Sequence, residues 1–585
     1  MNEIEQYVAS EDWISAASAL VDYLNLHPDL FDAKTAILAA TISMHMDGQH
    51  DITYEYISKG LKISPDNYEL YLLLGDWYLD KNINQAYLCY ENALYLCEKQ
   101  MGTEHDDTLF LRQVYDNMRN NATVDVQPVS FIILSWNTCD LLEACLKSIR
   151  NTCYEESYEL VIIDNGSTDG SVEWLRTQSD ITLIENHTNH GFAGGCNQGI
   201  QKATSGYDIF LLNSDTEMMF NSLFTLRMGL YSSSKIGAAG AVSNFVHPSQ
   251  RIDEACTSIL AGKKYAYKHN LPSLSALEYQ DWLVGFAELI KRPVIDQLHG
   301  FDEDYPVGNY EDNDLGFRIL KSGYRNVCCH NSFIYHWGHA SFKKNNIDIV
   351  AQEATNAKIF KHKWGIDPSY YGHIRTELIE LIPNCKSDPI EVLEIGCGSG
   401  STLARIAYLF PHSNVHGLEL MEQPAAFGAM KFDVHCGNIE TDPLPYQRAS
   451  MDYIILGDVL EHLHDPEAIL QKVKSYLKPT GSLIISLPNI MNARIIYQLL
   501  CGHFTYEEAG ILNRTHLKFF TYYEIIQMME RNGYQIETIN YINIPPESTS
   551  AFKNFFDQLC SIEEVADREM FDAYQYIFRA SIRNY

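Results

Sequence analysis

Acidic and amide side chains recur at the ends of apolar runs in the middle of the chain. The run VIID ends at Asp164, and the run DIFLL is followed by Asn213 and Asp215, two positions apart. In an extended chain that spacing places both side chains on one face. Oxygen ligands of this kind suit Mg²⁺ or Mn²⁺ bound to a nucleotide diphosphate. A carboxylate such as Asp164 can also accept hydrogen bonds from a nucleobase imide or a ribose hydroxyl.

The elements that position these side chains follow from the hydrophobic pattern. From Val129 to about residue 340, short β-branched runs alternate with amphipathic helices, which is typical of an α/β sheet. The predicted strands are FIILSW, ELVIID, ITLIEN and DIFLLN, and ligands bind at the carboxyl edge of such a parallel sheet. The segment HTNHGFAGGCNQGI, residues 187–200, supplies glycines and then opens a helix, whose N-terminus favours a diphosphate.

These motifs resemble those of family 2 glycosyltransferases of the GT-A fold, in the rhamnosyltransferase-like branch. Two later segments of that family's pattern are present in the same order: GFAELIKRPVIDQLHGFDEDYPVGNYEDNDLGFRILKSGYR from Gly285, and YHWGHAS from Tyr335. The resemblance implies an inverting transfer in which one carboxylate deprotonates the acceptor hydroxyl while a cation stabilises the departing nucleotide.

The resemblance also assigns roles to seven side chains. Asp164 and Asn197 would bind the nucleotide sugar; Asp215, Asn213 and His336 would hold Mg²⁺ or Mn²⁺; Asp312 would be the general base, with Glu311 beside it. Asn213 stands where the stricter motif has aspartate, which leaves metal dependence open. Each acid also has a structural interpretation, as a turn or helix cap or a solvated helix start. Capping does not explain why carboxylates recur at successive strand ends.

A second α/β pattern begins near residue 388. In EVLEIGCGSGS a strand is followed by Gly396, Gly398 and Gly400 and then by a helix, and Glu419 lies 19 residues beyond the last of these glycines. An acidic side chain at that distance can bind ribose hydroxyls. A dinucleotide is one alternative, but GCGSG lacks the final spaced glycine, which favours an open turn and S-adenosylmethionine.

Residues 388–585 resemble class I methyltransferases, which have a Rossmann-like fold. The supporting segments are LGDVLEHLHDP from Leu456, LKPTGSLIISLP from Leu477 and NRTHLKFFT from Asn513. The resemblance implies cofactor binding by Glu394, Gly396, Gly398, Gly400, Glu419 and Asn438, with His462 and His516 as candidate bases. The alternative is a degenerate domain that is retained for structure.

Helical spacing runs through the first 100 residues. Pro-Asp pairs at Pro28 and Pro65 lie 37 residues apart, and the second unit carries Leu74-Gly75, Tyr78, Ala86, Tyr90 and Ala93. This segment resembles tetratricopeptide repeats, whose helix pairs bind peptides or other subunits. A cap over the next domain is the alternative. Residues 1–124 contain 7 basic and 20 acidic side chains, so a protein partner here would present a basic face.

Length and charge limit the remaining alternatives. The 585 residues are divided into repeats at 1–124, a glycosyltransferase at 125–345, a helical linker at 346–387 and a methyltransferase at 388–585. The net charge of −33 disfavours nucleic acid and anionic membranes as partners. The apolar runs are too short to span a bilayer, and the N-terminus lacks a secretion signal, so we expect no transmembrane segment and a cytoplasmic location.

The predicted fold is therefore multidomain: an α-helical repeat, an α/β GT-A domain and an α/β Rossmann-like domain. The predicted function is bifunctional. A sugar would pass from a nucleotide-diphosphate donor to a glycan, lipid-linked glycan or glycoprotein acceptor, and a sugar hydroxyl would be methylated from S-adenosylmethionine, in bacterial surface polysaccharide or glycoprotein biosynthesis. The alternative is a non-catalytic repeat scaffold whose enzyme domains have decayed and bind a glycan or protein partner.

Overall fold

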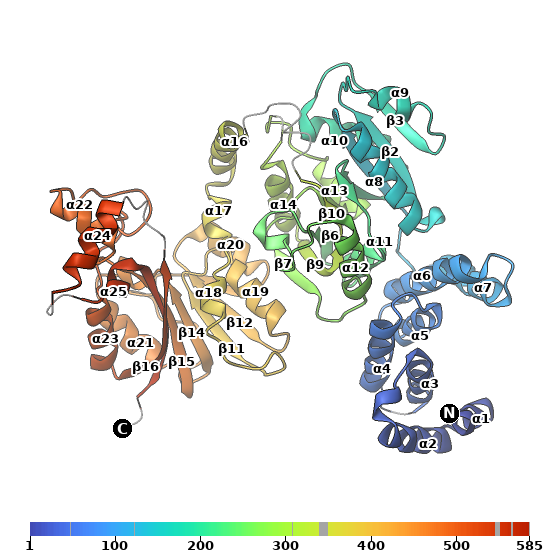
Figure 1. Ribbon diagram of the computed structural model, residues 1–585, viewed down its shortest axis with the longest axis horizontal. Coiled ribbons are helices and arrows are strands. Elements are labelled where there is room, and N and C mark those ends of the chain that lie inside the picture. The colour runs from blue at the N-terminus through green and yellow to red at the C-terminus, as the bar shows by residue number, and fades with distance from the viewer. Residues whose placement is uncertain are drawn as a thin grey trace. The chain divides into compact units, whose positions relative to one another are not determined.

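The chain folds into two compact units, Met1–Lys363 and Trp364–Tyr585 (Figure 1). The structure is a computed structural model and describes residues 1–583 except 47, 49, 122, 307, 339–348, 544–549 and 563–565. Each unit contains a large sheet with helices packed on it, and the first unit also carries a helical N-terminal segment. The predicted multidomain α/β organisation is confirmed.

The N-terminal segment is helical, and its successive helices pack against one another. Gly75 in α5 lies directly against the ring of Tyr90 in α6: a Cβ at Gly75 would come within 2.4 Å of the Tyr90 ring. Glycine is therefore the residue that lets these two helices approach. The helices are α1 (Asn2–Ala9), α2 (Trp13–Leu26), α3 (Ala33–Met44), α4 (His50–Ile63), α5 (Tyr68–Tyr78), α6 (Ile83–Met101) and α7 (Asp106–Arg119).

The sheet of the first unit has the order β3-β2-β1-β4-β8-β6-β9-β7. Its first four strands, which are the four predicted from the sequence, pair in parallel. β8 is antiparallel to both β4 and β6 and so joins this parallel half to the rest. The strands are β1 (Val129–Ser135), β2 (Tyr158–Asp164), β3 (Ile181–Glu185), β4 (Asp208–Asn213), β6 (Ile236–Val242), β7 (Leu277–Gln280), β8 (Ala287–Ile290) and β9 (Arg325–Phe333).

Both faces of this sheet are buried, which explains the continuous apolar runs of its strands. Phe131 and Ile133 of β1 belong to a core that includes α8 (Cys139–Thr152), whereas Ile132 belongs to a core that includes α10 (Gly191–Lys202) and α14 (Glu311–Lys321). Because successive side chains point to opposite faces of the sheet, one strand contributes side chains to two cores. The carboxyl ends of β1, β2 and β4 are in register at one edge.

A short two-stranded ladder lies outside the main sheet. β5 (Thr216–Glu217) pairs antiparallel with β10 (Tyr335–His336), so that His336 lies opposite Thr216. The backbone N–H of Trp337 also donates to the carbonyl of Asp215, at 2.9 Å. The ladder therefore fixes a late segment of the unit beside the chain that follows β4.

The N-terminal helices share a hydrophobic core with one face of this sheet. Arg227 of α11 (Ser222–Leu230) forms a buried ion pair with Glu91 of α6, and also donates to the carbonyl of Gln127 at 3.1 Å. Asn221 donates to the hydroxyl of Tyr71 at 2.6 Å. Residues of α5 and α6 therefore complete the core beneath α11.

The segment predicted as a helical linker is divided between the two units. α16 (Ile349–Trp364) packs on the first unit through Asn356, Phe360 and Lys363. α17 (Pro368–Tyr371) and α18 (Thr376–Ile379) belong to the second unit, where Leu378 and Ile379 enter a core cluster.

The sheet of the second unit has the order β13-β12-β11-β14-β15-β17-β16, and β17 is antiparallel to its neighbours. The turn after its central strand β11 is the glycine-rich segment, as the sequence predicted. The strands are β11 (Glu391–Ile395), β12 (Asn414–Glu419), β13 (Asp433–Cys436), β14 (Met451–Gly457), β15 (Leu477–Pro488), β16 (Tyr534–Asn543) and β17 (Ala573–Ile582).

Helices cover both faces of this second sheet. Leu483 and Ile485 of β15 pack in a core with α21 (Pro466–Lys474) and α23 (Tyr522–Arg531), while Ile484 packs in a core with α18 and α19 (Ser401–Leu409). Such a doubly covered parallel sheet presents its strand ends as the place for ligands. Within the described part of the chain, no helix combines the length and apolarity needed to cross a bilayer.

We predict that the buried ion pair beneath α11 is essential for the stability of the first unit. Replacing Arg227 by Met leaves the Glu91 carboxylate buried without its partner, which costs about 3–5 kcal/mol when one member of a buried pair is removed. Scanning calorimetry of the full chain should show a lower unfolding temperature for Arg227→Met. The double change Arg227→Met with Glu91→Met should recover much of the loss. Arg176→Met, which removes an exposed pair with Glu185, serves as the control. An equal midpoint for Arg227→Met and Arg176→Met would contradict the prediction.

Candidate active sites

A cavity of about 440 Å³ opens at the carboxyl edge of the sheet in the first unit. Its walls come from the ends of β1 and β4, the start of α10, the loop after β6, the start of β8 and the start of α14. Five of the side chains assigned to the glycosyltransferase site from the sequence line it: Asn213, Asp215, Glu311, Asp312 and His336. The structure thus brings together residues that lie up to 123 positions apart.

Asp215 and His336 face each other in this cavity. The Nε2 atom of His336 lies 3.1 Å from Oδ1 of Asp215. The Nδ1 atom of His336 lies 2.6 Å from the carbonyl oxygen of Phe245, and a carbonyl can only accept, so Nδ1 carries a proton. In the neutral ring Nε2 then presents a lone pair toward the carboxylate.

This arrangement fits a divalent cation. Metal-binding histidines commonly donate their second N–H to a carbonyl, as His336 does to Phe245. Neighbouring ligands on an octahedral Mg²⁺, each at about 2.1 Å, are separated by about 3 Å, which agrees with the Nε2–Oδ1 separation of 3.1 Å. Asn213 lines the same cavity from the end of β4. The imidazole favours Mn²⁺ over Mg²⁺ in such a ligand set.

Two acidic side chains begin α14 in the same cavity. Burial raises the pKa of Glu311 well above its usual value, and the neighbouring Asp312 raises it further. Burial also raises the pKa of Asp312, but the backbone N–H groups of Gly285 and Asn313 donate to its carboxylate at 3.1 and 2.8 Å. These bonds stabilise the charged form of Asp312, so the pair favours a negative charge on Asp312 over one on Glu311.

The loop before this pair has an unusual backbone. Asn309 and Tyr310 both adopt positive φ angles, 72° and 74°, which are costly for residues other than glycine. The side chain of Asn356 in α16 donates to the carbonyls of Gly308 and Asn309 at 2.9 and 2.8 Å and so holds the loop in place. Sequence reasoning assigned Asn356 only to a linker, and nothing in the local pattern identified this contact.

Glu288 is a further acid that sequence reasoning missed. It lies in the middle of β8, is fully buried, and neither of its carboxyl oxygens has a hydrogen-bond partner among the described residues. Burial, followed by the charge of Asp312, raises its pKa well above the usual value. A charged residue inside the apolar run GFAELI is the signal that could have identified it.

Neither Asp164 nor Asn197 is among the described residues that line the cavity. Asp164 ends β2 next to the cavity-lining Asn165; its Oδ1 accepts from Gly166 and Ser167, while its buried Oδ2 has no partner among the described residues. Asn197 faces away from this cavity, because its amide exchanges hydrogen bonds with the backbone of Phe301. We therefore keep Asp164, and not Asn197, in the proposed donor site.

Aromatic and basic side chains complete the cavity. Trp136, Phe192 and Phe245 line it and provide flat apolar surfaces, and Arg251 is the one lysine or arginine among its described lining residues. A guanidinium suits a phosphate group. Trp136, Phe245 and Arg251 lie in loops and Phe192 lies in the first turn of α10, without a recognisable spacing among them, so no sequence pattern selected them.

In the second unit, the predicted glycine turn follows β11. Gly396, Gly398 and Gly400 have φ angles of 75°, 56° and 83°, a region that other residues rarely adopt. A Cβ at Gly398 would also lie 2.8 Å from the carbonyl oxygen of Tyr371. The turn therefore requires glycine at these positions and brings bare backbone to the sheet edge. Tyr371, in the segment predicted as linker, closes over this turn.

Glu419 anchors the turn from the end of β12. Its Oε2 accepts from the backbone N–H of Gly398 and its Oε1 from that of Met421, both at 2.9 Å. Carboxylate lone pairs remain for two ribose hydroxyls. Glu394 is buried within β11, and burial raises its pKa to about 8. The side chain of Asn438, after β13, accepts from the backbone of Glu440 at 2.8 Å.

These features fit S-adenosylmethionine. The Oε2 atom of Glu394 is buried without a hydrogen-bond partner among the described residues and so can accept from a ligand ammonium group. Arg375, which sequence reasoning did not select, donates to Asp458 at 2.9 Å and to Ser486 at 3.0 Å and holds the ends of β14 and β15 together.

His462 and His516, the two candidate bases, lie close to each other. Their ring centres are 4.8 Å apart. His462 is in a 3₁₀ turn (Leu460–His462) after β14, whereas His516 comes from a loop before α23. Burial lowers the pKa of His516, which keeps this ring neutral at physiological pH.

Two families of known proteins match separate segments of the chain. The family described as Glycosyl transferase family 2 matches residues 130–245, and the family described as Methyltransferase domain matches residues 369–539. The first match covers β4 and the start of the loop after β6 in the cavity wall but ends before Glu311, Asp312 and His336, and the second covers the glycine turn, Glu419 and both histidines.

Curated relatives are similar to the same two segments. Methyltransferase str2 of Strobilurus tenacellus is 34% identical over 107 residues, 18% of this chain and 38% of that protein. Poly-beta-1,6-N-acetyl-D-glucosamine synthase of Staphylococcus aureus strain MSSA476 is 24% identical over 222 residues, 37% of this chain and 52% of that protein. The chain spans about a third to a half of the length of the curated relatives it matches.

Solved structures give weaker similarity. A mannosyltransferase from Pyrobaculum calidifontis, solved in complex with GDP-Man and Mn²⁺, has 18% sequence identity and a TM-score of 0.30 over 46% of this chain and 75% of that one. Taken together, the family matches establish that the chain contains one segment similar to family 2 glycosyltransferases and one similar to methyltransferase domains.

We predict that Glu394 makes the second unit less stable as the pH rises. Its pKa is about 8 in the folded chain against a usual 4.5, so the folded state binds more protons than the unfolded state between these values. Stability from this group is therefore full below pH 4.5 and is lost as the pH rises through about 8. Calorimetry of Glu394→Gln should show a flatter pH dependence than the parent chain. Glu422→Gln, at an exposed site, should not. Parallel profiles for Glu394→Gln and the parent would contradict the assignment.

Proposed function

We propose that this chain is a bifunctional enzyme that transfers a sugar from a nucleotide-diphosphate donor and a methyl group from S-adenosylmethionine. The main support for sugar transfer is that one cavity contains both the Asp215–His336 pair and the Glu311–Asp312 pair. The glycine turn anchored by Glu419 supports the second. The two family matches agree with both.

In the glycosyltransferase site, Asp164 binds the nucleoside through its unpartnered oxygen. Asp215, His336 and Asn213 would hold a divalent cation, which would supply positive charge to a donor diphosphate, and Arg251 adds a further positive charge. The rings of Trp136 and Phe192 limit the access of water to the sugar. These residues fix the donor so that one face of its reacting carbon is open to the acceptor.

Asp312 is the proposed general base. Its raised pKa brings it nearer to neutrality, where a base removes a hydroxyl proton most effectively, while the N–H groups of Gly285 and Asn313 keep it charged. Burial raises the pKa of the neighbouring Glu311 further from its usual value and makes it the less suitable base. Asp314 is a poorer candidate because it is buried in ion pairs with Arg318 and Lys363. One base and one cation are sufficient for transfer with inversion.

In the methyltransferase site, S-adenosylmethionine supplies an activated methyl group when bound. Glu419 binds the ribose, Glu394 accepts from the amino-acid moiety, and the turn from Gly396 to Gly400 leaves room for it. Asn438 stands near the adenine position at the end of β13. The protein mainly aligns donor and nucleophile in such a displacement.

Because one chain carries both sites, we infer that they act on the same acceptor glycan. We propose that the methyl group is placed on a sugar hydroxyl of the same glycan, lipid-linked glycan or glycoprotein, as part of bacterial surface polysaccharide or glycoprotein biosynthesis. The N-terminal helices are proposed to be tetratricopeptide-like. Because residues of α3 to α6 share a core with the sheet, the first role of these helices is to cover it, and a protein partner would use α1 and α2.

We predict that Asp312→Asn loses transfer but retains the donor. Loss of a general base lowers the rate by about 10²–10⁴-fold, whereas the Asp215–His336 pair is unchanged. Donor hydrolysis and transfer should be followed with a panel of nucleotide sugars and Mn²⁺, and donor binding by calorimetric titration. Asp304→Asn, an exposed acid in the preceding loop, should be fully active. Full activity of Asp312→Asn would move the base to Glu311. The complete absence of donor binding by the parent chain would favour the scaffold alternative.

We predict that Glu419→Gln weakens S-adenosylmethionine binding, because the amide turns one of its two acceptor oxygens into a donor that cannot pair with the N–H of Gly398 or Met421. Gly398→Ala should abolish binding, since its Cβ would lie 2.8 Å from the Tyr371 carbonyl. Isothermal titration of the full chain measures both. Glu422→Gln provides the control. Unchanged affinity in both site variants would contradict this cofactor assignment.

A further inference from the structure

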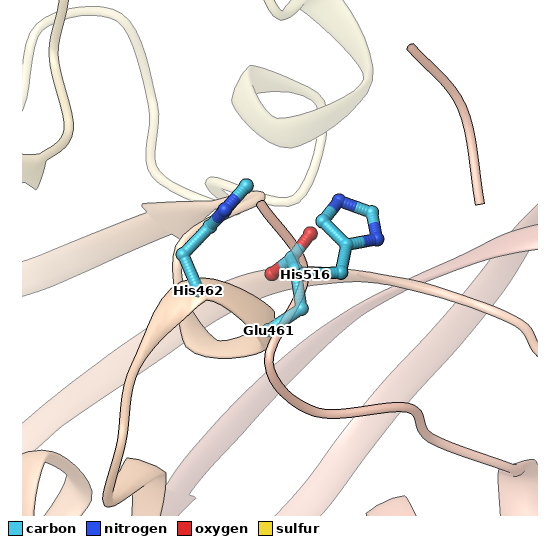
Figure 2. A group of neighbouring side chains, drawn as sticks. All are labelled: Glu461, His462 and His516. Atoms are coloured by element: carbon cyan, nitrogen blue, oxygen red, sulfur yellow. The ribbon is translucent and has the colours of Figure 1, made fainter. Parts of the chain in front are cut away.

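Glu461, His462 and His516 form a compact group in the second unit (Figure 2). One potential ligand atom from each residue lies within 4.8 Å of those of the other two. Figure 2 shows the Glu461 carboxylate between the two imidazole rings. Glu461 is 1% exposed, and its Oε2 atom is buried with no hydrogen-bond partner among the described residues.

Both imidazole rings are held in the same tautomer. Nδ1 of His462 lies 3.1 Å from the carbonyl oxygen of Thr515, and Nδ1 of His516 lies 2.8 Å from that of Ile511. Since a carbonyl can only accept, each Nδ1 carries the proton, and each neutral ring presents an Nε2 lone pair. Metal-binding histidines are oriented by second hydrogen bonds of this kind.

Backbone hydrogen bonds join the two segments that carry Glu461, His462 and His516. The N–H groups of Leu517 and Lys518 donate to the carbonyl of Glu461 at 2.8 and 3.0 Å. The loop that carries His516 is therefore tied to the turn that carries Glu461 and His462. A site held in this way loses little conformational entropy when it binds an ion. Asp458, which precedes the turn, has a positive φ angle of 56°, a strained conformation that is common at functional sites.

We propose that Glu461, His462 and His516 bind a divalent transition-metal ion of the Zn²⁺ or Co²⁺ type. Two imidazole nitrogens and one carboxylate oxygen are a ligand set that such ions prefer over Mg²⁺ or Ca²⁺. Three protein ligands leave coordination positions open for a ligand. The ligand atoms, at most 4.8 Å apart here, would approach to about 3.3 Å in a tetrahedral site with bonds of about 2.0 Å.

The location suggests what the ion does, in a role that rests on the proposed methyltransferase function. The turn that carries Glu461 and His462 follows β14, which pairs in parallel with β11 so that Leu456 lies opposite Ile395. A Cβ at Gly396, in the glycine turn after β11, would lie 2.9 Å from Cγ2 of Val459, two residues before Glu461. The metal group therefore lies near the proposed cofactor site. An acceptor hydroxyl bound at an open position would release its proton to water at a lower pH than in free solution. In this role the two histidines are ligands, and not bases.

The test uses the full chain with Asp215→Asn and His336→Ala, so that the proposed cation site of the first unit does not contribute. The protein is stripped with a chelator and titrated with Co²⁺, and the visible absorption of the bound ion and the metal content are measured. We expect one equivalent to bind. His462→Ala, His516→Ala and Glu461→Gln, each added to this background, should weaken binding by at least about 10-fold. Circular dichroism confirms that each variant is folded.

His464→Ala is the matched control, because this exposed histidine lies two residues from His462 but pairs with Glu440. It should bind Co²⁺ as tightly as the background. Absence of Co²⁺ binding in the background, or equal affinity in all four variants, would overturn the metal site. S-adenosylmethionine titration of the same proteins separates the two proposals. If the cofactor fails to bind while Co²⁺ binding depends on the three ligands, the proposed methyltransferase function fails and the metal site stands.

Discussion

The pairing of β5 with β10 is the constraint on which the site in the first unit depends. It consists of two residues on each strand, with His336 opposite Thr216. This ladder fixes the imidazole against Asp215, although 121 positions separate them in the chain. Neither side chain is a useful metal ligand alone. The backbone hydrogen bonds supply the alignment, so the two proposed ligand atoms are 3.1 Å apart, and the proposed cation would need little reorganisation to bind.

Buried acids are the second common feature of the two units. In the described part of the chain, the acids that have a buried oxygen without a hydrogen-bond partner are Glu5, Asp164, Glu288, Glu311, Glu394 and Glu461. Five of these six lie at or beside a candidate site. Such burial opposes folding, since a charged or unpaired carboxyl group loses its hydration. Five of these buried acids lie near the candidate sites, so their cost in stability falls there. A bound ligand or cation would supply the interactions that these carboxyl groups lack.

The candidate sites of the two units are built in similar ways. Each has a mixed sheet buried on both faces, and each places bare backbone and acidic side chains at the carboxyl ends of its parallel strands. They differ in what holds the site together. In the first unit, β10 returns to the carboxyl edge of the sheet. There α16 also fixes the loop before Glu311, through the side chain of Asn356. In the second unit, Glu419 fixes the glycine turn, and the loop of His516 is bonded to the turn of Glu461.

The sequence by itself determined the elements and most of the candidate residues. Apolar runs bounded by glycine and polar residues identified β1 to β4 and β11, because strands buried on both faces carry a strong local signal. Asp164, Asp215 and Glu419 were found for the same reason, since each lies at or just beyond a strand end. Tertiary structure decided what depends on distant segments. It placed Asn197 against Phe301, away from the cavity, and divided the expected linker between the two units. It also joined His462 and His516 to Glu461, because the hydrogen bonds that orient both rings come from loop carbonyls that leave no pattern in the sequence.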